Sequence, residues 1–209
     1  YPSSIALYRL QRMAFKDSTL LIVGCIYDKS NIWPCYWEND KKVMLGDEPG
    51  LVSGIFVEGD DVYMSGFIFQ DYHSPKPCYW KNGKQYYLPG SGWASSLVFS
   101  NSDFYVVGVL LDGYESYPCY WKNGKLEKLS EKQGSINSVF ASKNGDIYYA
   151  GTSGTKAAYW KNDEMVKLSK STGIAQSIYV SDNDVYVVGI AGSSNPAKCW
   201  KNNKKHKLM

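Results

Sequence analysis

Three aspartates, Asp28, Asp71 and Asp112, are the residues of this chain whose type and spacing come closest to a catalytic set. Each lies in a loop segment at a related place in one copy of a repeated pattern, so the three side chains could converge. Cleavage of a glycosidic bond by two carboxyl groups requires the acids to lie roughly 5 to 9.5 Å apart. A glycoside-active enzyme that uses these carboxylates is therefore one hypothesis for the chain.

Other catalytic and metal-binding patterns are missing from the sequence. The two histidines, His73 and His206, belong to distant copies of the repeat, and neither is part of a ligand-spaced His or Cys cluster. There is no Gly-x-Ser-x-Gly elbow, and Gly90-Ser91-Gly92 is too short for a phosphate-binding loop. We therefore expect a non-enzymatic protein with no catalytic residue, no metal site and no cofactor.

A motif that recurs five times along the chain must position these residues. Each copy has a Trp, a charged residue and an Asn, and the copies follow one another every 39 to 43 residues. A period near 40 residues is typical of repeat architectures, in which each unit buries its apolar face against its neighbours. We expect one domain over residues 1–209, with copies at residues 1–45, 46–88, 89–129, 130–168 and 169–209. The recurring tryptophans, which we expect in the core, are Trp37, Trp80, Trp121, Trp160 and Trp200.

Each copy predicts four strands, A to D in chain order. A run of aromatic and β-branched residues that ends in Gly, such as residues 62–66, precedes the Trp strand, and such residues favour strands. Asn82-Gly83 and Asn123-Gly124 are signals for two-residue hairpins between the Trp strand and strand D. Four-stranded units of about 40 residues arranged in a ring are typical of β-propellers. The expected fold is all-β, a five-bladed β-propeller with four antiparallel strands per blade.

The two ends of the chain decide how such a ring would close. The first copy begins with its strand A near residues 12–15, and the last copy ends just after Leu208. The copies are therefore nearly whole, and closure can rest on packing between blades. An outer strand from residues 1–9 is the alternative, and the sequence leaves both open.

The repeat core resembles that of a known group of proteins. It stands as Cys78-Tyr79-Trp80-Lys81-Asn82-Gly83 in the second copy and as Cys119-Tyr120-Trp121-Lys122-Asn123-Gly124 in the third. This is similar to bacterial propeller-type repeats with a Tyr-Trp-Lys-Asn-Gly core, many of them in uncharacterised surface or exported proteins. The resemblance implies an extracellular, cell-surface or periplasmic location. The architecture also resembles five-bladed lectins of the tachylectin type, although no lectin binding motif is matched.

The five cysteines favour buried thiols over disulfides. Cys35, Cys78 and Cys119 occupy the same repeat position, and equivalent positions on different blades should lie too far apart for a bond that needs Cα atoms within about 7 Å. Cys25 and Cys199 stand where other copies have apolar or aromatic residues. We expect small buried hydrophobic side chains at these positions.

The placement of the charges matters more than the net charge of +3. Lysines lie at or beside the C–D hairpins, so one face of the ring should be basic: Lys81, Lys84, Lys122, Lys125, Lys161, Lys201, Lys204 and Lys205. Lysines at tight turns also keep strand edges soluble, and no nucleic-acid-binding module accompanies them. We interpret them as solvated turns and expect no nucleic-acid partner. No run approaches the ~18 to 20 apolar residues of a membrane span, so none is expected.

The opposite face of the ring carries the connections that differ between copies. If the strands alternate in direction, the B–C and D–A connections share this face, and binding is usually placed on variable loops. The first three B–C segments, residues 25–34, 67–77 and 109–118, are rich in aromatic residues and carboxylates, which suit sugar faces or a peptide. The last two, residues 152–157 and 190–197, are small and polar. The candidate ligand-binding residues are Tyr27, Asp28, Trp33, Asp71, Tyr72, His73, Trp93, Asp112, Tyr114 and Tyr117.

The sequence thus favours a monomeric binding or scaffold module whose B–C and D–A loop face takes a glycan or a protein ligand. Two alternatives stand beside the enzyme hypothesis. The loop aromatics can simply pack over the ends of the blades, or the ring can be a structural spacer in a surface protein.

Overall fold

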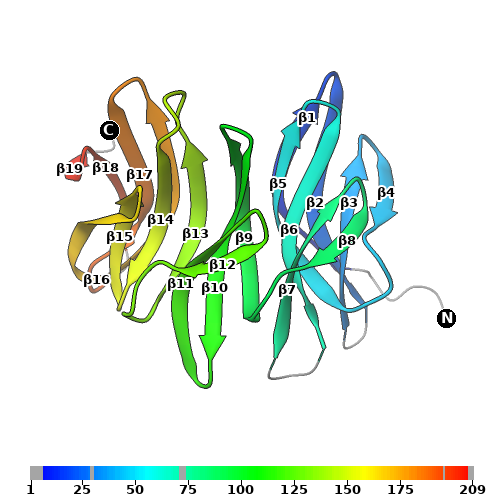
Figure 1. The fold of residues 1–209 in the computed structure, drawn as a ribbon, viewed down its shortest axis with the longest axis horizontal. Helices are drawn as coiled ribbons and strands as arrows, with labels where there is room; N and C mark the ends of the chain where they lie inside the picture. The colour runs from blue at the N-terminus through cyan, green and yellow to red at the C-terminus, as the bar shows by residue number, and fades with distance from the viewer. Residues whose placement is uncertain (1–6, 29–30, 71–73, 195, 207–209) are drawn as a thin grey trace. The chain divides into compact units, whose positions relative to one another are not determined.

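The computed structural model describes residues 7–28, 31–70, 74–194 and 196–206 (Figure 1). Every regular element in these ranges is a β-strand, which confirms the predicted all-β fold. The strands pair into antiparallel four-stranded sheets, and these sheets are blades of the β-propeller type, as predicted. Within the same ranges no helix has the length and apolar character needed to cross a membrane.

The chain divides into two compact units, Tyr1–Leu97 and Val98–Met209, which we call the N-terminal and C-terminal units. The boundary falls inside β9 (Ser91–Ser100). The prediction that residues 1–209 form one domain stays a prediction.

The N-terminal unit contains the first two blades and the beginning of a third. Strand order is β1-β2-β3-β4 in the first blade and β5-β6-β7-β8 in the second. Residues 7–9 belong to β1, which is strand A of the first blade, so they do not form an outer strand. The bounds are β1 (Leu7–Lys16), β2 (Thr19–Asp28), β3 (Asn31–Glu38), β4 (Lys41–Met44), β5 (Gly50–Glu58), β6 (Asp61–Phe69), β7 (Pro75–Lys81) and β8 (Lys84–Tyr87).

The C-terminal unit holds most of the third blade and all of the fourth and fifth. The third blade has the order β12-β11-β10-β9, whereas β13 to β19 form one continuous sheet of seven strands. The continuity arises because β16 (Glu164–Ser181) is strand D of the fourth blade and also strand A of the fifth. The other bounds are β10 (Asp103–Asp112), β11 (Glu115–Lys122), β12 (Lys125–Lys128), β13 (Gly134–Ala141), β14 (Ile147–Ser153), β15 (Lys156–Lys161), β17 (Asp184–Ala191), β18 (Ala197–Lys201) and β19 (Lys204–His206).

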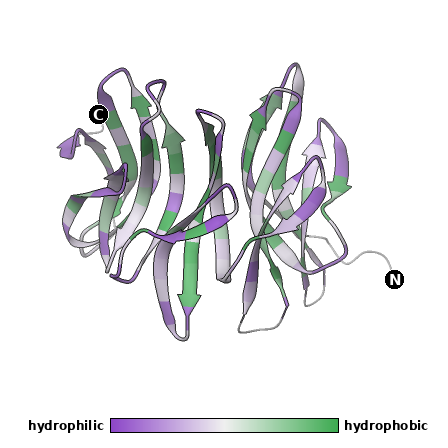
Figure 2. Ribbon diagram, in the orientation of Figure 1, coloured by the Kyte–Doolittle hydropathy of each residue, from purple (hydrophilic) through white to green (hydrophobic). Residues whose placement is uncertain are grey.

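The recurring Asn residues make the predicted C–D hairpins. All five have positive φ angles, between 46° and 53°, a conformation that Asn tolerates better than most residues. Figure 2 shows the resulting pattern, with apolar residues along the strands and polar residues at the hairpin ends. The Asn residues are Asn39, Asn82, Asn123, Asn162 and Asn202.

The recurring Trp lies between blades. In the N-terminal unit Trp80 packs in a buried cluster with Val23 and Leu45 of the first blade. Its indole N–H donates to the Leu45 carbonyl at 2.9 Å and to Gln85 Oε1 at 3.1 Å. The Trp side of the second blade therefore faces the first blade, as the core assignment predicted.

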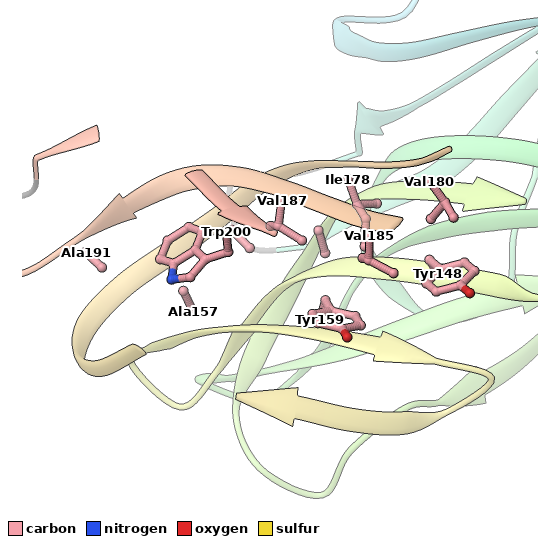
Figure 3. Packing of buried hydrophobic residues seen from close by; sticks show 11 residues of the cluster. Tyr148, Ala157, Tyr159, Ile178, Val180, Val185, Val187, Ala191 and Trp200 are labelled. Carbon is pink, nitrogen blue, oxygen red and sulfur yellow. The ribbon is translucent and has the colours of Figure 1, made fainter. Parts of the chain in front are cut away.

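The same arrangement recurs in the C-terminal unit between the fourth and fifth blades. Trp200 of the fifth blade is 3% exposed and joins a cluster with Ala157 and Tyr148 of the fourth. Figure 3 shows the cluster extending from Ala191 and Trp200 towards Val180 and Tyr148. Blade-to-blade burial of apolar side chains is thus the main source of stability inside each unit.

All five cysteine thiols are buried, and none is bonded to another. Burial raises the pKa of Cys35 to about 12 and raises the pKa of Cys78 and Cys119 as well. These side chains behave as small hydrophobic residues of the core.

Candidate functional site

On the hairpin face, three polar side chains tie the A–B turn to the C–D hairpin in the same way in four blades. In the third blade Lys122 Nζ lies 2.7 Å from Asp103 Oδ2, and Asn123 Nδ2 donates to Asp103 Oδ1 at 2.8 Å. Asn123 Oδ1 accepts the backbone N–H of Phe104 at 2.8 Å. The matching ion pairs of the other blades are Lys81–Asp61, Lys161–Asp146 and Lys201–Asp184.

These contacts explain why the motif recurs. The hydrogen bonds from Lys122 and then Asn123 hold the pKa of Asp103 below its ordinary value, and Lys122 Nζ also lies 5.3 Å from the centroid of the Tyr105 ring. Thr19 and Glu38 stand at the Asp and Lys positions of the first blade, so the pair cannot form there. The basic charge predicted for the hairpin face is therefore partly neutralised, and the lysines that directly follow the recurring Trp in four blades have a structural role.

The predicted ligand-binding residues are distributed over both units. Tyr27 and Asp28 end β2, Trp33 lies in β3 and Trp93 lies in β9, all within the N-terminal unit. Asp28 is exposed, whereas the three aromatic side chains are half-buried.

Three further candidates lie at the β10–β11 turn of the C-terminal unit. They are Asp112, Tyr114 and Tyr117. The remaining candidates, Asp71, Tyr72 and His73, lie outside the described residues. The convergence of the three loop aspartates stays a prediction. Among the described residues no group of three or more His, Cys, Asp or Glu side chains is placed to hold a metal ion.

Tyr117 anchors a polar cluster at the loop end of the third blade. Its hydroxyl donates to Glu115 Oε2, and Gln133 Nε2 donates to Glu115 Oε1 at 3.1 Å. Lys128 Nζ lies 3.7 Å from the centroid of the Tyr117 ring. The bond to Glu115 raises the pKa of Tyr117 to about 12 and lowers the pKa of Glu115. Nearby in sequence, the side chain of Tyr114 is fully exposed at the turn.

Two adjoining hollows lie over the fourth and fifth blades, formed by B–C and D–A connections. One has a volume of about 290 Å³ and the other about 610 Å³. They share Thr155 and Lys156 of the fourth B–C turn. The first is lined by Lys132, Ser153, Gly154, Thr155, Lys156, Ala157, Ala158 and Lys167, and the second by Thr155, Lys156, Lys170, Ser171, Thr172, Gly192 and Ser193.

Four exposed lysines line these hollows: Lys132, Lys156, Lys167 and Lys170. Neither lining contains a carboxylate, and none of the four lysines makes an ion pair within the described part of the chain. They contrast with the paired lysines of the hairpin face. Unpaired ammonium groups around a concave surface make a local positive potential that attracts anions.

The backbone joins the Tyr117 cluster to the first hollow. The N–H of Gly154, in the hollow, donates to the carbonyl of Gln133 at 2.6 Å. The side-chain amide of Gln133 donates a hydrogen bond to Glu115. Gln133 also follows Lys132, which lines the first hollow, directly in the chain. The exposed Tyr114, the Tyr117 cluster and the lysine-lined hollows thus belong to one loop region of the C-terminal unit.

The sequence did not indicate these hollows, because the last two B–C connections are short and polar. The available signal was the position of the lysines. Lys132, Lys167 and Lys170 lie in or next to D–A connections, away from the C–D hairpins where Asp partners recur. Lysines that lie away from the recurring Asp partners could therefore have indicated a region of unpaired positive charge.

Arg12 is a further residue whose role the sequence did not indicate. It stands in β1 where the other copies have Gly or Ser. In the N-terminal unit its Nη1 donates to Ser96 Oγ of β9 at 3.4 Å, and burial lowers its pKa. Arg12 therefore links the first inner strand to the beginning of the third blade.

The chain matches no protein-family model and no curated protein sequence. Among solved structures it is similar to a subtype N10 neuraminidase-like protein of A/little yellow-shouldered bat/Guatemala/060/2010, with 10% identity and a TM-score of 0.55 over 97% of this chain and 85% of that one. A GH43_1 enzyme from Xanthomonas citri has 7% identity and a TM-score of 0.49, over 98% of this chain and 91% of that one.

A GH43_12 structure retrieved from capybara gut metagenome has 13% identity and a TM-score of 0.44, over 93% of this chain. The chain spans half the length of that protein, because the match covers 50% of it. At such low identities the similarity to the neuraminidase-like protein shows the fold alone, and the other two carry no argument about function.

Proposed function

We propose that the chain is a non-enzymatic binding module for acidic glycans and that its ligand occupies the lysine-lined hollows of the C-terminal unit. The observation that carries the proposal is the set of four unpaired lysines around two adjoining hollows without a carboxylate in their lining. A glycan carboxylate or sulfate would supply the missing negative charge. Exposed charge pairs of this kind contribute about 0.2–1 kcal/mol each, so several contacts are needed for useful affinity.

The remaining groups of the region favour a glycan over other anions. Hydroxyl groups of Ser153, Thr155 and Thr172 line the hollows between the lysines, and hydroxyl and amide groups bind sugar hydroxyls. The exposed ring of Tyr114 offers a flat surface for a sugar face.

Nucleic acid fits the same region less well. The C-terminal unit contains no arginine, the residue whose planar guanidinium binds phosphate in a bidentate manner. No aromatic side chain lines either hollow, so bases would find no ring to stack on there. A glycan with carboxylate or sulfate groups is the ligand that accounts for both the lysines and the hydroxyls.

The test is affinity electrophoresis or calorimetry with four polymers: polygalacturonate, dextran sulfate, neutral dextran and a single-stranded oligonucleotide. We expect binding to one or both acidic glycans, no binding to neutral dextran, and weakening by salt because exposed charges are screened. Equal or tighter binding of the oligonucleotide would move the proposal from glycans to nucleic acids. Tight binding of neutral dextran would contradict the role of the lysines.

Two double variants with the same net charge locate the site. Lys156→Gln with Lys167→Gln removes two ammonium groups from the hollows, whereas Lys204→Gln with Lys205→Gln removes two exposed ones from a C–D hairpin. The first should weaken binding about tenfold, which corresponds to about 1.4 kcal/mol, and the second should leave it nearly unchanged. Equal losses in both would show a general charge effect instead of a site.

A further inference from the structure

The two lysine-lined hollows take their lysines from different parts of a bulge in β16. In the pairing of β15 with β16, Lys156 lies opposite Thr172, whereas Ala158 lies opposite Lys167. The residues of β16 between Lys167 and Thr172 therefore outnumber those opposite them and leave the regular ladder. Bulges redirect side chains. The result here is that Lys167 lines the first hollow, whereas Lys170, which lies inside the bulge, lines the second.

Hydrogen bonds hold this bulge in shape. Ser169 Oγ accepts the backbone N–H of Ala157 at 3.1 Å and donates to the carbonyl of Ser171 at 2.7 Å. Next to the bulge, the N–H of Gly173 donates to the carbonyl of Thr155 at 2.9 Å. The segments that carry the lysines are therefore fixed relative to each other, so the two hollows are preformed, as is usual for ligand sites.

The two hollows differ in size and in charge. The first has a volume of about 290 Å³ and is lined by Lys132, Lys156 and Lys167. The second has a volume of about 610 Å³ and is lined by Lys156 and Lys170. Sites for small ligands have volumes of about 300–1,000 Å³, so the first hollow lies at the lower limit of this range. A short anionic ligand should therefore prefer the three lysines of the first hollow, and only a longer one can reach Lys170 as well.

Lys156 lines both hollows, which favours one extended ligand over two separate ones. Two small anions in adjoining hollows would share this ammonium group and would repel each other. In a single chain the anionic groups are already joined, so the second contact is intramolecular and gains from a high effective concentration. The hydroxyl groups of Ser171, Thr172 and Ser193 in the second hollow suit the uncharged parts of such a chain.

We propose that the two hollows are subsites of one groove for a linear acidic glycan that carries negative charges on several of its units. This inference rests on the proposed function and narrows it to chains long enough to contact Lys167 and Lys170 at once. Single acidic sugars and short fragments leave one subsite empty and bind weakly for that reason. The bulge of β16 sets the spacing between the two contacts.

Calorimetric titration with galacturonate oligomers and dextran sulfate, both separated by length, tests the two subsites. The affinity of the wild-type chain should rise at least about tenfold at the length that first reaches the second hollow. Lys167→Gln should weaken short and long oligomers alike, by about two- to fivefold. Lys170→Gln should leave short oligomers unchanged and weaken only those beyond the step. Lys143→Gln removes an ammonium group from the exposed A–B turn of the fourth blade and, as the control, should leave the affinities nearly unchanged.

The outcomes separate this inference from the proposed function. A smooth rise of affinity with length, with Lys167→Gln and Lys170→Gln weakening every length equally, would overturn the two-subsite groove and leave the acidic-glycan site in place. Equal affinities for the shortest and the longest fractions would do the same. Failure of every fraction to bind, the longest included, would overturn the proposed function and the groove with it. Thermal unfolding serves as the folding check, and we expect melting temperatures close to that of the wild type, since all three substituted lysines are exposed.

Discussion

Replacing Trp80 by Ala tests the interface between the first two blades most directly. The indole of Trp80 is 0% exposed and packs in the buried cluster with Val23, Leu45 and Met64. Its N–H donates to the carbonyl of Leu45 at 2.9 Å. The substitution would therefore leave a cavity between the blades and would remove a hydrogen bond from a buried acceptor.

The expected cost follows from these two losses. Truncation of a buried Trp to Ala costs about 3–5 kcal/mol, and a buried acceptor left unpaired costs about 1–3 kcal/mol. Because neighbouring effects do not simply add, we expect a loss of at least about 4 kcal/mol in the free energy of unfolding. Whole domains are stable by only about 5–15 kcal/mol, so this loss would leave little stability.

Trp37 provides a matched control at the same repeat position. It is only half-buried in the first blade, so Trp37→Ala should cost less than half as much, about 1–2 kcal/mol. Trp80→Phe separates the two losses, because it retains an aromatic ring and removes the N–H donor. We expect its cost to lie between those of the two Ala variants.

Urea denaturation followed by far-ultraviolet circular dichroism measures all three variants on one scale. The reasoning is refuted if Trp80→Ala costs less than about 1 kcal/mol, since a buried interface Trp cannot be that dispensable. Equal costs for Trp80→Ala and Trp37→Ala would also refute it, because the burial of the two side chains differs.

The pairing on the hairpin face predicts a dependence of stability on pH. Lys122 and Asn123 lower the pKa of Asp103 below its ordinary value of 3.8, so its carboxylate stabilises the fold above that pH and the contribution disappears as the pH falls through the lowered pKa. Thermal unfolding of Asp103→Asn should therefore show a smaller loss of melting temperature on acidification below about pH 4 than the wild type does, and an unchanged loss would argue against the pair. The buried thiols predict a second result: Ellman's reagent should label none of the five cysteines in the native chain and all five after denaturation. Rapid labelling of a native thiol would contradict its burial. Removing the cation of the inner strand by Arg12→Met should lower the melting temperature, because its bond to Ser96 is lost, and a melting temperature equal to that of the wild type would show that this link adds no stability.

The fold could be predicted from this sequence because the same hairpin and core residues recur in all five copies of the repeat. Asn82 and Asn123 adopt the positive φ angles that their hairpins require, and Trp80 and Trp121 are fully buried, as their recurrence implied. Residues that recur in every copy serve what every blade needs, which is to pair its strands and to bury its apolar face against the neighbouring blade.

The sequence did not predict that strand D of the fourth blade continues into strand A of the fifth. The residues between them, Ser169–Thr172, contain no Gly or Pro to interrupt the strand, and β16 runs through them. The second and third blades begin after connections that contain Gly and Pro, Gly46 and Pro49 before β5 and Pro89 and Gly90 before β9. The connection before β13, residues 129–133, contains neither, and the strand nevertheless ends there.

The candidate site was harder to predict for the same reason that the fold was easy. Lys122 and Lys156 have the same charge in the sequence, but the first has an Asp partner 2.7 Å away and the second lines a hollow without one. The difference depends on Asp103, which lies across a hairpin 19 residues away from Lys122. The Lys that directly follows the recurring Trp is paired with an Asp in four blades, so the proposed function places the anionic ligand on lysines outside that position. In this chain, function is to be sought where the copies differ.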